Sequence, residues 1–240
     1  MDELLGIDPS PDDVGRHNAQ IENSKLRIIE GATWKKQDIA VIIPASHMIN
    51  AKVVLSWMNL IYPPNNGVVR IMTQGLEVGE AYSKAVDQVL THPVFSKFKY
   101  ILTLEHDNVP PGDGVLKLLK YMEDFPEYDA ISGLYWTKGE QGVPQLWGDV
   151  KDPVVNFRPQ PPTEEVQECY GIGMGFALWR LEMFRDKNIP RPFFKTVVSM
   201  DGVGTQDLYF CKNARMYGHR FAVATKVLVG HIDVNSGIIW

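Results

Sequence analysis

A short run of acidic and imidazole side chains follows an apolar segment in KYILTLEHDNVPPG, residues 99–112. Residues i and i+2 of an extended chain point to the same side, so we expect Glu105 and Asp107 to converge and His106 to point away. Two carboxylates held together repel each other unless a proton or a cation lies between them. Oxygen ligands of this kind suit Mg²⁺ or Mn²⁺, which also bind substrate phosphates. A polar strand end that faces water is the alternative interpretation.

Two further side chains that could take part in binding or catalysis occur near the end of the sequence. In GTQDLYFCKNARMYG, Thr205 is a good N-cap and places Asp207 in the first helical turn, on the same face as Cys211 and Ala214. This spacing predicts that Asp207 points toward the body of the protein, although an acidic residue there also complements the helix dipole. His231 ends the apolar run VLVGHI, where it is either a metal ligand or an ordinary hydrogen-bonded residue.

The segment YGIGMGFALW has glycine at every second position, Gly171, Gly173 and Gly175. This G-x-G-x-G spacing differs from the dinucleotide-binding fingerprint, and no βαβ pattern surrounds it. A backbone that makes a tight turn or lies close to a ligand is the interpretation we favour.

Strand and helix patterns alternate in the first part of the chain, and they determine where these side chains lie. Continuous apolar runs of strand length are separated by segments with helical spacing, which is typical of a mostly parallel sheet with helices on both faces. Ligands of such sheets bind beyond the carboxyl ends of the strands, where residues 105–107 are expected. Residues 138–166 are predicted to be loop with one or two short strands. The predicted strands are 38–46, 67–75, 99–107, 129–136 and 219–232, and the predicted helices are 50–64, 77–93, 112–126 and 205–218.

The composition limits the class of protein. The chain has 240 residues, of which 45% are hydrophobic and 22% charged, with a net charge of −5, and this disfavours sequence-independent binding of nucleic acid. Two cysteines, Cys169 and Cys211, are too few for a disulfide framework or a cysteine-based zinc site, which favours a reducing compartment. No apolar run reaches membrane-spanning length and the N-terminus is acidic, so we expect a cytoplasmic protein, of a cell or of a virus in its host. Residues 1–36 are expected to form an arm before a single domain, residues 37–240.

The order of these features resembles the GT-A-type glycosyltransferases, most closely the inverting family 2. In that family an Asp-x-Asp motif ends a strand before a Pro-containing turn and a helix, as in LTLEHDNVPPGDGVLKLL, which has Glu in place of the first Asp. The segment GIGMGFALWRLEMF matches the family's Gly-rich stretch. The segment QDLYFCKNARMYGHRF matches its D-x-x-F-C-x-x-A-R-x-x-G pattern, and KVLVGHI matches V-x-V-x-H. The resemblance covers roughly residues 38–233.

The resemblance implies an activity and a set of site residues. Asp107 would bind a divalent cation, Mn²⁺ or Mg²⁺, with His231 as a further ligand, and Glu105 would contribute through the metal shell or the ribose of the donor. Asp207 would be the base that deprotonates an acceptor hydroxyl in an inverting transfer from a nucleotide-diphosphate sugar, a UDP-sugar above others. The resemblance also implies a nucleotide-binding half, 37–137, and an acceptor half, 138–240. The donor would contact Pro44, Ala45, Thr73, Gln74, Lys84, Glu105 and His106, and the acceptor or sugar would contact Trp136, Gly173, Met174, Gly175 and Gln206.

The chain departs from the family pattern at three places. The loop MTQGLE lacks the Asp that often recognises the nucleobase of the donor in the family. The segment AYSKA lacks the family's Arg-Asn pair, for which Lys84 is a candidate substitute. Gln206 replaces an acidic residue and leaves Asp207 as the only candidate base in its motif. The missing Asp and Arg-Asn positions make a non-catalytic module that binds a nucleotide or glycan one alternative. A retaining transferase is another, because a metal-binding His in this position also occurs in retaining GT-A relatives. The acceptor stays open among a glycan, a protein, a lipid-linked sugar and a modified nucleobase.

Overall fold

The computed structural model describes residues 37–64, 66–199 and 202–240, so the predicted arm, residues 1–36, lies outside the described part. The helices are α2 (Ala51–Met58), α3 (Val78–Thr91), α4 (Gly114–Asp124) and α5 (Gln206–Arg215), with short 3₁₀ helices η1 (Phe95–Lys97) and η2 (Leu181–Arg185). The strands are β1 (Ile39–Ala45), β2 (Val68–Gln74), β3 (Tyr100–Leu104), β4 (Asn108–Val109), β5 (Ala130–Leu134), β6 (Leu146–Trp147), β7 (Val166–Cys169), β8 (Gly171–Ile172), β9 (Phe176–Arg180), β10 (Val197–Ser199), β11 (Gly202–Gly204), β12 (Phe221–Leu228) and β13 (Gly230–His231).

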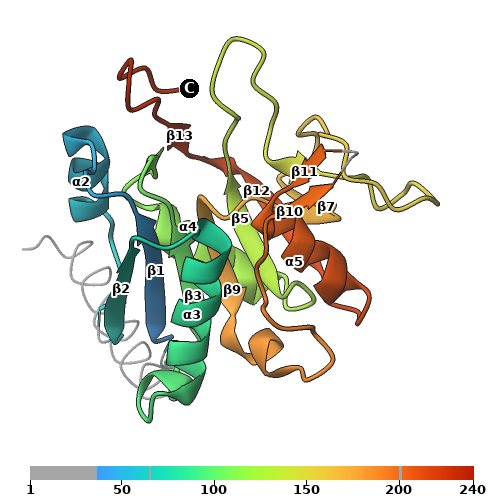
Figure 1. Ribbon diagram of the computed structural model, residues 1–240, viewed down its shortest axis with the longest axis horizontal. Helices are drawn as coiled ribbons and strands as arrows, with labels where there is room; N and C mark the ends of the chain where they lie inside the picture. Colours follow the sequence, from blue (N-terminus) through green and yellow to red (C-terminus); the bar gives the residue numbers. More distant parts are fainter. Residues whose placement is uncertain (1–36, 65, 200–201) are drawn as a thin grey trace, which may run out of the picture. The chain divides into compact units, whose positions relative to one another are not determined.

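The central sheet has seven strands in the order β2-β1-β3-β9-β5-β12-β7 (Figure 1). Strand β1 pairs in parallel with β2 and β3, and β12 pairs in parallel with β5. Strand β9 runs antiparallel between β3 and β5, and β7 runs antiparallel at the edge beside β12. Five strands thus point the same way, and the prediction of a mostly parallel mixed sheet flanked by helices is confirmed.

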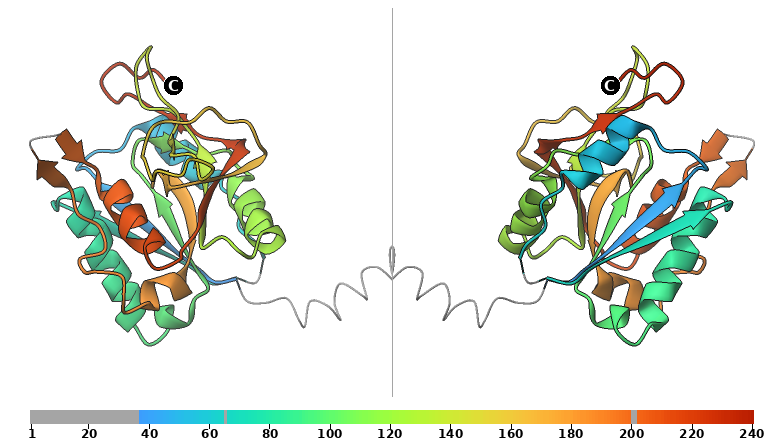
Figure 2. Two further views of the ribbon diagram at one scale, coloured as in Figure 1. Left: turned by 90° about the vertical axis from the view of Figure 1, so that its right-hand side faces the viewer. Right: turned by 90° about the vertical axis from the view of Figure 1, so that its left-hand side faces the viewer.

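Helices cover both faces of this sheet (Figure 2). Helices α3 and α5 pack on one face, and α4 packs on the other. Alternate side chains of β1 enter the two layers: Ile39, Val41 and Ile43 join the α4 side, and Ala40 and Ile42 join the α3 side. Burying an Ile or Val side chain completely contributes roughly 1.5–3 kcal/mol, so a strand buried on both faces stabilises both layers at once.

Two predicted elements end earlier than the apolar pattern indicates. Helix α2 stops at Met58 rather than at the proline pair, because Asn59 caps it and Ile61 N–H donates to Gly112 O at 2.8 Å instead. Strand β3 stops at Leu104, and Asn108 N–H closes a turn onto Glu105 O at 3.1 Å. The alternation of an extended chain therefore does not apply to residues 105–107. The prediction that His106 points away from its two neighbours rested on that alternation, and all three residues line one pocket.

Within the described ranges, no helix combines the length and the apolar composition needed to cross a bilayer.

Candidate functional site

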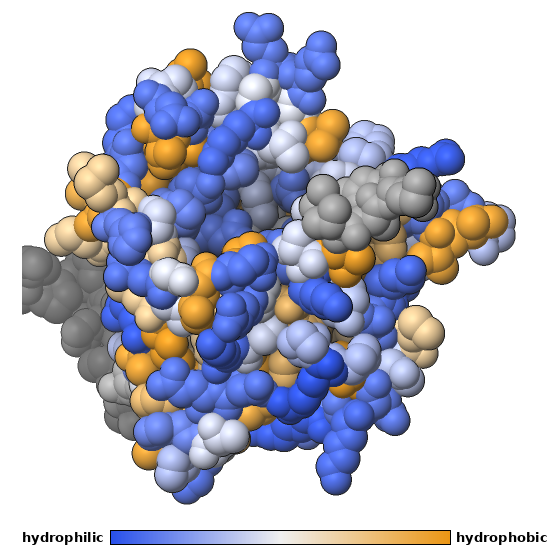
Figure 3. All heavy atoms as spheres, in the orientation of Figure 1, coloured by the Kyte–Doolittle hydropathy of each residue, from blue (hydrophilic) through white to orange (hydrophobic). Residues whose placement is uncertain are grey.

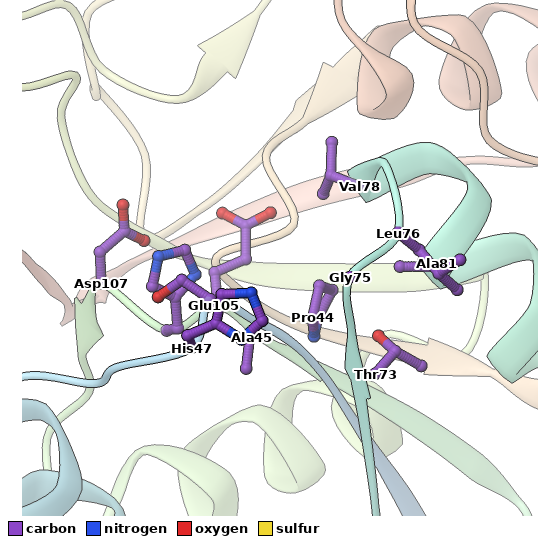
Figure 4. Close-up of a pocket in the computed structure, with 12 residues that line it drawn as sticks. Pro44, Ala45, His47, Thr73, Gly75, Leu76, Val78, Ala81, Glu105 and Asp107 are labelled. Atoms are coloured by element: carbon purple, nitrogen blue, oxygen red, sulfur yellow. The ribbon is translucent and has the colours of Figure 1, made fainter.

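A pocket of about 470 Å³ lies at the carboxyl ends of β1, β2 and β3, a volume within the ordinary range of ligand sites. Figure 3 shows a hollow bordered by hydrophilic residues at the end of the sheet where these strands finish, and Figure 4 shows the pocket's side chains. This is the place at which open α/β sheets bind ligands. The pocket is lined by Pro44, Ala45, Ser46, His47, Thr73, Gly75, Leu76, Val78, Ala81, Glu105, His106 and Asp107.

A two-residue ladder brings Asp107 and His231 together. Strand β13 pairs antiparallel with β4, His231 opposite Asn108, and Ile232 N–H donates to Asp107 O at 2.8 Å. The ring Nε2 of His231 lies 3.3 Å from Asp107 Oδ2, and its Nδ1 lies 2.7 Å from the carbonyl oxygen of Trp136. A carbonyl can only accept, so Nδ1 carries a hydrogen, and Nε2 donates to the Asp107 carboxylate when the ring is doubly protonated.

Asp107 is the most strongly stabilised anion of the site. Lys138 Nζ donates to Asp107 Oδ2 at 2.5 Å, from the loop that follows β5. Burial works to raise the pKa of Asp107, but hydrogen bonds from His231 and Lys138, together with their charges, outweigh it. The pKa of this carboxyl is therefore held well below its usual range, and Asp107 is ionised at neutral pH.

Glu105 has the opposite electrostatic character. Its backbone N–H donates to Gly175 O at 3.0 Å, and its side chain accepts from the hydroxyl of Tyr82 at 3.2 Å. Burial, and then the negative charges of Asp107 and Asp207, raise the pKa of Glu105 to about 8. Glu105 is therefore largely protonated at neutral pH, and the two carboxyl groups of the LEHD motif differ in charge.

Asp207 lies in the first turn of α5 and is only 8% exposed, as its position on the Cys211 and Ala214 face predicts. Burial raises its pKa, while hydrogen bonds from the Thr205 side chain and the Leu208 N–H, the latter at 2.8 Å, oppose the rise. Thr205 is the N-cap residue but makes no side-chain capping bond. Asp207 does not line the pocket itself, yet its charge acts on the buried Glu105 and so belongs to the same cluster.

The alternating glycines form a close-packed floor under this cluster. A Cβ at Gly173 would lie 2.2 Å from the Tyr135 hydroxyl oxygen, and one at Gly175 would lie 2.4 Å from Asn108 Oδ1. The Gly175 N–H also donates to the Tyr135 hydroxyl at 2.8 Å. These glycines thus permit close contact between two segments of the protein itself, because their missing side chains leave room for Tyr135 and Asn108.

The other residues predicted to contact the donor or the acceptor differ in their burial and in whether they line the pocket. Lys84 pairs with Glu80 at 2.6 Å on an exposed part of α3 and does not line the pocket. The Gln74 side chain donates to Ser46 O at 3.2 Å and so links the loops after β2 and β1. Trp136 and Gln206 are half-buried, whereas Met174 is fully covered.

Sequence reasoning missed several groups of the site, namely Ser46, His47, Tyr82, Tyr135 and Lys138. Ser46 and His47 directly follow Pro44 and Ala45, so their position after the first strand was a usable signal. The tyrosines carried no such signal, because a buried aromatic residue on an apolar helix face or strand is usually core.

The side-chain atoms of Asp107 and His231 suit a divalent cation that is bound together with phosphates. Asp107 supplies an ionised oxygen, and His231 supplies a ring nitrogen whose other nitrogen is fixed by a backbone carbonyl, the usual support of a metal-binding histidine. Mg²⁺ and Mn²⁺ sites often use one or two protein ligands and complete the shell with substrate phosphates. Among residues 37–64, 66–199 and 202–240, no three His, Cys, Asp or Glu side chains form a metal-binding group on their own.

Comparisons with known proteins show the fold and do not reach a family. No family model matches the chain, and no curated protein matches it. The solved structure of A197 from STIV has a TM-score of 0.58 at 17% identity, over 82% of this chain and 86% of that one. The structure of S. aureus TarS 1-349 in complex with UDP-GlcNAc has a TM-score of 0.50 at 12% identity, over 80% of this chain and 57% of that one. TarS 1-349 in complex with UDP gives the same TM-score and identity, over 59% of its length. The likeness agrees with the GT-A-type α/β fold, while the assignment to inverting family 2 stays a prediction.

Proposed function

We propose that this chain is a glycosyltransferase that moves a sugar from a nucleoside-diphosphate sugar, above all a UDP-sugar, to a hydroxyl acceptor with inversion. One observation carries the proposal: Glu105 and Asp107 line a ligand-sized pocket at the carboxyl end of the sheet, His231 lies against Asp107, and the charge of Asp207 acts on Glu105. The fold likeness to TarS in complex with UDP-GlcNAc supports the donor class. In this proposal the donor's nucleotide occupies the pocket bordered by Pro44, Ala45 and Thr73.

Asp107 and His231 would hold a divalent cation, Mn²⁺ or Mg²⁺, next to the donor's diphosphate. Such an ion, when bound, neutralises the negative charge that develops on the departing nucleoside diphosphate. Glu105 lines the pocket beside Asp107 and is placed to hydrogen-bond a donor oxygen such as a ribose hydroxyl.

Asp207 would act as the general base. The acceptor oxygen attacks the anomeric carbon, the bond from that carbon to the phosphate oxygen breaks, and the nucleoside diphosphate leaves with the electron pair. Asp207 takes the proton of the acceptor hydroxyl. Its raised pKa makes it a stronger base than an exposed aspartate, which suits this step. The acceptor would approach from the half-buried side chains Trp136 and Gln206, above the buried Gly173, Met174 and Gly175.

A thermal-shift screen of nucleoside diphosphates and their sugars, each with and without Mn²⁺, tests the donor assignment. At a concentration a hundredfold above Kd, a ligand stabilises the folded state by about 2.7 kcal/mol, which raises Tm by roughly 5–10 °C in a domain of this size. We expect the largest shift for UDP or a UDP-sugar with Mn²⁺. Equal shifts with all four bases, or none with any, would contradict the proposal.

The variant Asp107→Ala tests the cation. It removes the carboxylate that the cation needs, so nucleotide binding should lose its dependence on Mn²⁺. Isothermal titration with UDP, with and without Mn²⁺, measures this. Asp113→Ala is the matched control, because Asp113 pairs with Lys117 on the exposed start of α4, away from the pocket. An unchanged Mn²⁺ effect in Asp107→Ala would remove Asp107 from the metal site.

The stereochemistry of the product separates the remaining alternatives. Inversion agrees with Asp207 as base, whereas retention would give Asp207 a positioning role. A panel of glycan, protein, lipid-linked and nucleobase acceptors should be tried with the donor that the screen identifies. A chain that binds a nucleotide sugar and neither hydrolyses nor transfers it would be a binding module.

A further inference from the structure

Lys138 places an ammonium group against the acidic cluster from the loop that follows β5. Its Nζ donates to Asp107 Oδ2 at 2.5 Å, and its side chain is 32% exposed, at the boundary between the site and solvent. In the part of the chain that the structure describes, Asp107 is the only hydrogen-bond or ion-pair partner of Lys138. The position of this ammonium therefore depends on a single carboxylate.

The backbone on either side of Lys138 is fixed, whereas the side chain can turn. Thr137 N–H donates to Val143 O at 2.9 Å, and Val143 N–H donates to the Thr137 hydroxyl oxygen at 2.9 Å. Between these anchors Gly139 adopts a φ of +103°, which permits the turn at the tip. Figure 1 shows this loop rising above the end of the sheet. The four-carbon stem of Lys138 can thus swing while the loop keeps its hydrogen bonds.

A divalent cation on Asp107 and the ammonium of Lys138 in its present position exclude each other. A cation that bridges Asp107 and His231 would use Asp107 Oδ2, which lies 3.3 Å from His231 Nε2 and is the oxygen that Lys138 Nζ contacts. Two cations on one oxygen of a half-buried carboxylate repel strongly, because little water screens them. A cation held between Asp107 Oδ2 and His231 Nε2 would therefore displace Lys138 from this oxygen.

We propose that Lys138 binds the diphosphate of the donor, and that on binding it exchanges its ion pair with Asp107 for an ion pair with a phosphate oxygen. In the free protein its ammonium holds Asp107, and when a divalent cation enters with a nucleoside diphosphate, the ammonium moves to a phosphate oxygen. This inference rests on the proposed function.

The charges at the site support this exchange. A diphosphate brings several anionic oxygens next to the cation, and a lysine ammonium is a compact partner for such oxygens. Before binding, Lys138 and Asp107 pair with each other; after binding, Lys138 pairs with phosphate and Asp107 with the divalent cation. Neither charge is therefore left without a partner in a half-buried site. Lys84, the lysine that the family pattern pointed to, is already paired with Glu80 on α3.

The variant Lys138→Met separates the two roles of the side chain by effects of opposite sign. Without the competing ammonium, Mn²⁺ alone should bind the nucleotide-free protein about tenfold more tightly. Without the phosphate contact, UDP should bind about tenfold more weakly at saturating Mn²⁺. Isothermal titration with MnCl₂, and then with UDP, measures both, and general damage to the site would weaken both instead.

Two control variants sharpen the experiment. Lys138→Arg keeps the charge, so both affinities should stay near those of the wild type. Lys151→Met removes an exposed ammonium that pairs with Glu164 at 3.2 Å, and neither affinity should change. Unchanged or weaker Mn²⁺ binding by Lys138→Met, with UDP binding to the wild type intact, overturns the exchange alone. Failure of the wild type to bind UDP with Mn²⁺ overturns the proposed function and the exchange together.

Discussion

The two ends of the central sheet each place a histidine beside carboxylates, but the acidic groups at one end are more deeply buried. Where β5 and β12 begin, His219 lies between Asp129 and Asp186, with ring nitrogens 3.2 Å from each carboxylate. There the Asp129 side chain also accepts from Arg220 N–H at 3.0 Å. At the opposite end, His231 faces Asp107 next to two more carboxyl groups.

The difference lies in how deeply the acidic groups are buried. At the carboxyl end, Glu105, Asp107 and Asp207 share Lys138 and His231, and burial of Glu105 and Asp207 raises the pKa of both. Perturbed acidic groups gathered beside a pocket are typical of a site that binds or reacts. The His219 cluster, by contrast, connects the segments before two strands and serves stability. The following predictions test this contrast, from the largest expected effect to the smallest.

Asp207→Asn should lower the rate of sugar transfer roughly 10²- to 10⁴-fold, because the amide cannot accept the proton of the acceptor. UDP affinity with Mn²⁺ should stay near that of the wild type. The control is Asp129→Asn at the other end of the sheet, which should leave the transfer rate unchanged. Steady-state kinetics measure both. Equal losses in the two variants would mean that Asp207 acts through stability rather than chemistry.

Gly175→Ala should destabilise the protein by roughly 1–3 kcal/mol, because its Cβ would lie 2.4 Å from Asn108 Oδ1 and the floor of the site would have to shift. Gly204→Ala is the matched control, since a Cβ there would meet nothing nearer than 3.7 Å. Urea unfolding measures the free energies. A loss in Gly204→Ala as large as that in Gly175→Ala would refute the close packing that we describe.

His219→Gln should change how stability depends on pH, by on the order of 1 kcal/mol. The hydrogen bond to Asp129 first, and the charges of both aspartates, raise the pKa of His219 above its ordinary value near 6.5, against the effect of burial. A pKa raised by folding stabilises the protein fully below the unfolded value, and this stabilisation is lost as pH rises through the folded value.

The wild type should therefore exceed the variant in stability below about pH 6.5, by an amount that shrinks at higher pH. Urea unfolding at pH 5.5 and 8.5 measures this. The raised pKa of Glu105 also lowers the stability of the protein as pH rises from about 4.5 to 8. Because the wild type and the variant both contain Glu105, the difference in stability between them isolates His219. A difference that does not vary with pH would show that folding leaves the pKa of His219 unchanged, contrary to the expectation.

Much of the fold could be predicted because burial on two faces leaves a clear pattern in the sequence. The runs at β1, β3 and β5 are buried at nearly every position, and α3 and α4 carry apolar stripes, so their existence and order followed directly. The place of β9 could not be predicted. Its apolar sequence shows that it is buried, but nothing in it specifies hydrogen bonding to both β3 and β5.

The residues of the candidate site could be predicted where a polar side chain stands in an otherwise apolar segment. The other residues of the site could not be predicted. Asp107 and His231 end apolar runs, and Asp207 interrupts a buried helix face, so each contrasted with its neighbours. The turn at residues 105–108 was missed because the apolar pattern of β3 continues to its last residue and gives no sign of where hydrogen bonding ends. Lys138 was missed because its partner is 31 residues away, in a loop without periodicity.

The ladder between β4 and β13 also has a consequence for when the proposed site forms. It joins Asp107 to His231 across 124 residues, so the histidine reaches the carboxylate only after most of the chain has folded. Contacts this distant in sequence form late, because closing a long loop costs entropy before any contact offsets it. During synthesis the walls formed by β1, β2 and β3 emerge first, without the imidazole. The growing chain therefore cannot hold a metal-bound donor in the proposed way until β13 is in place.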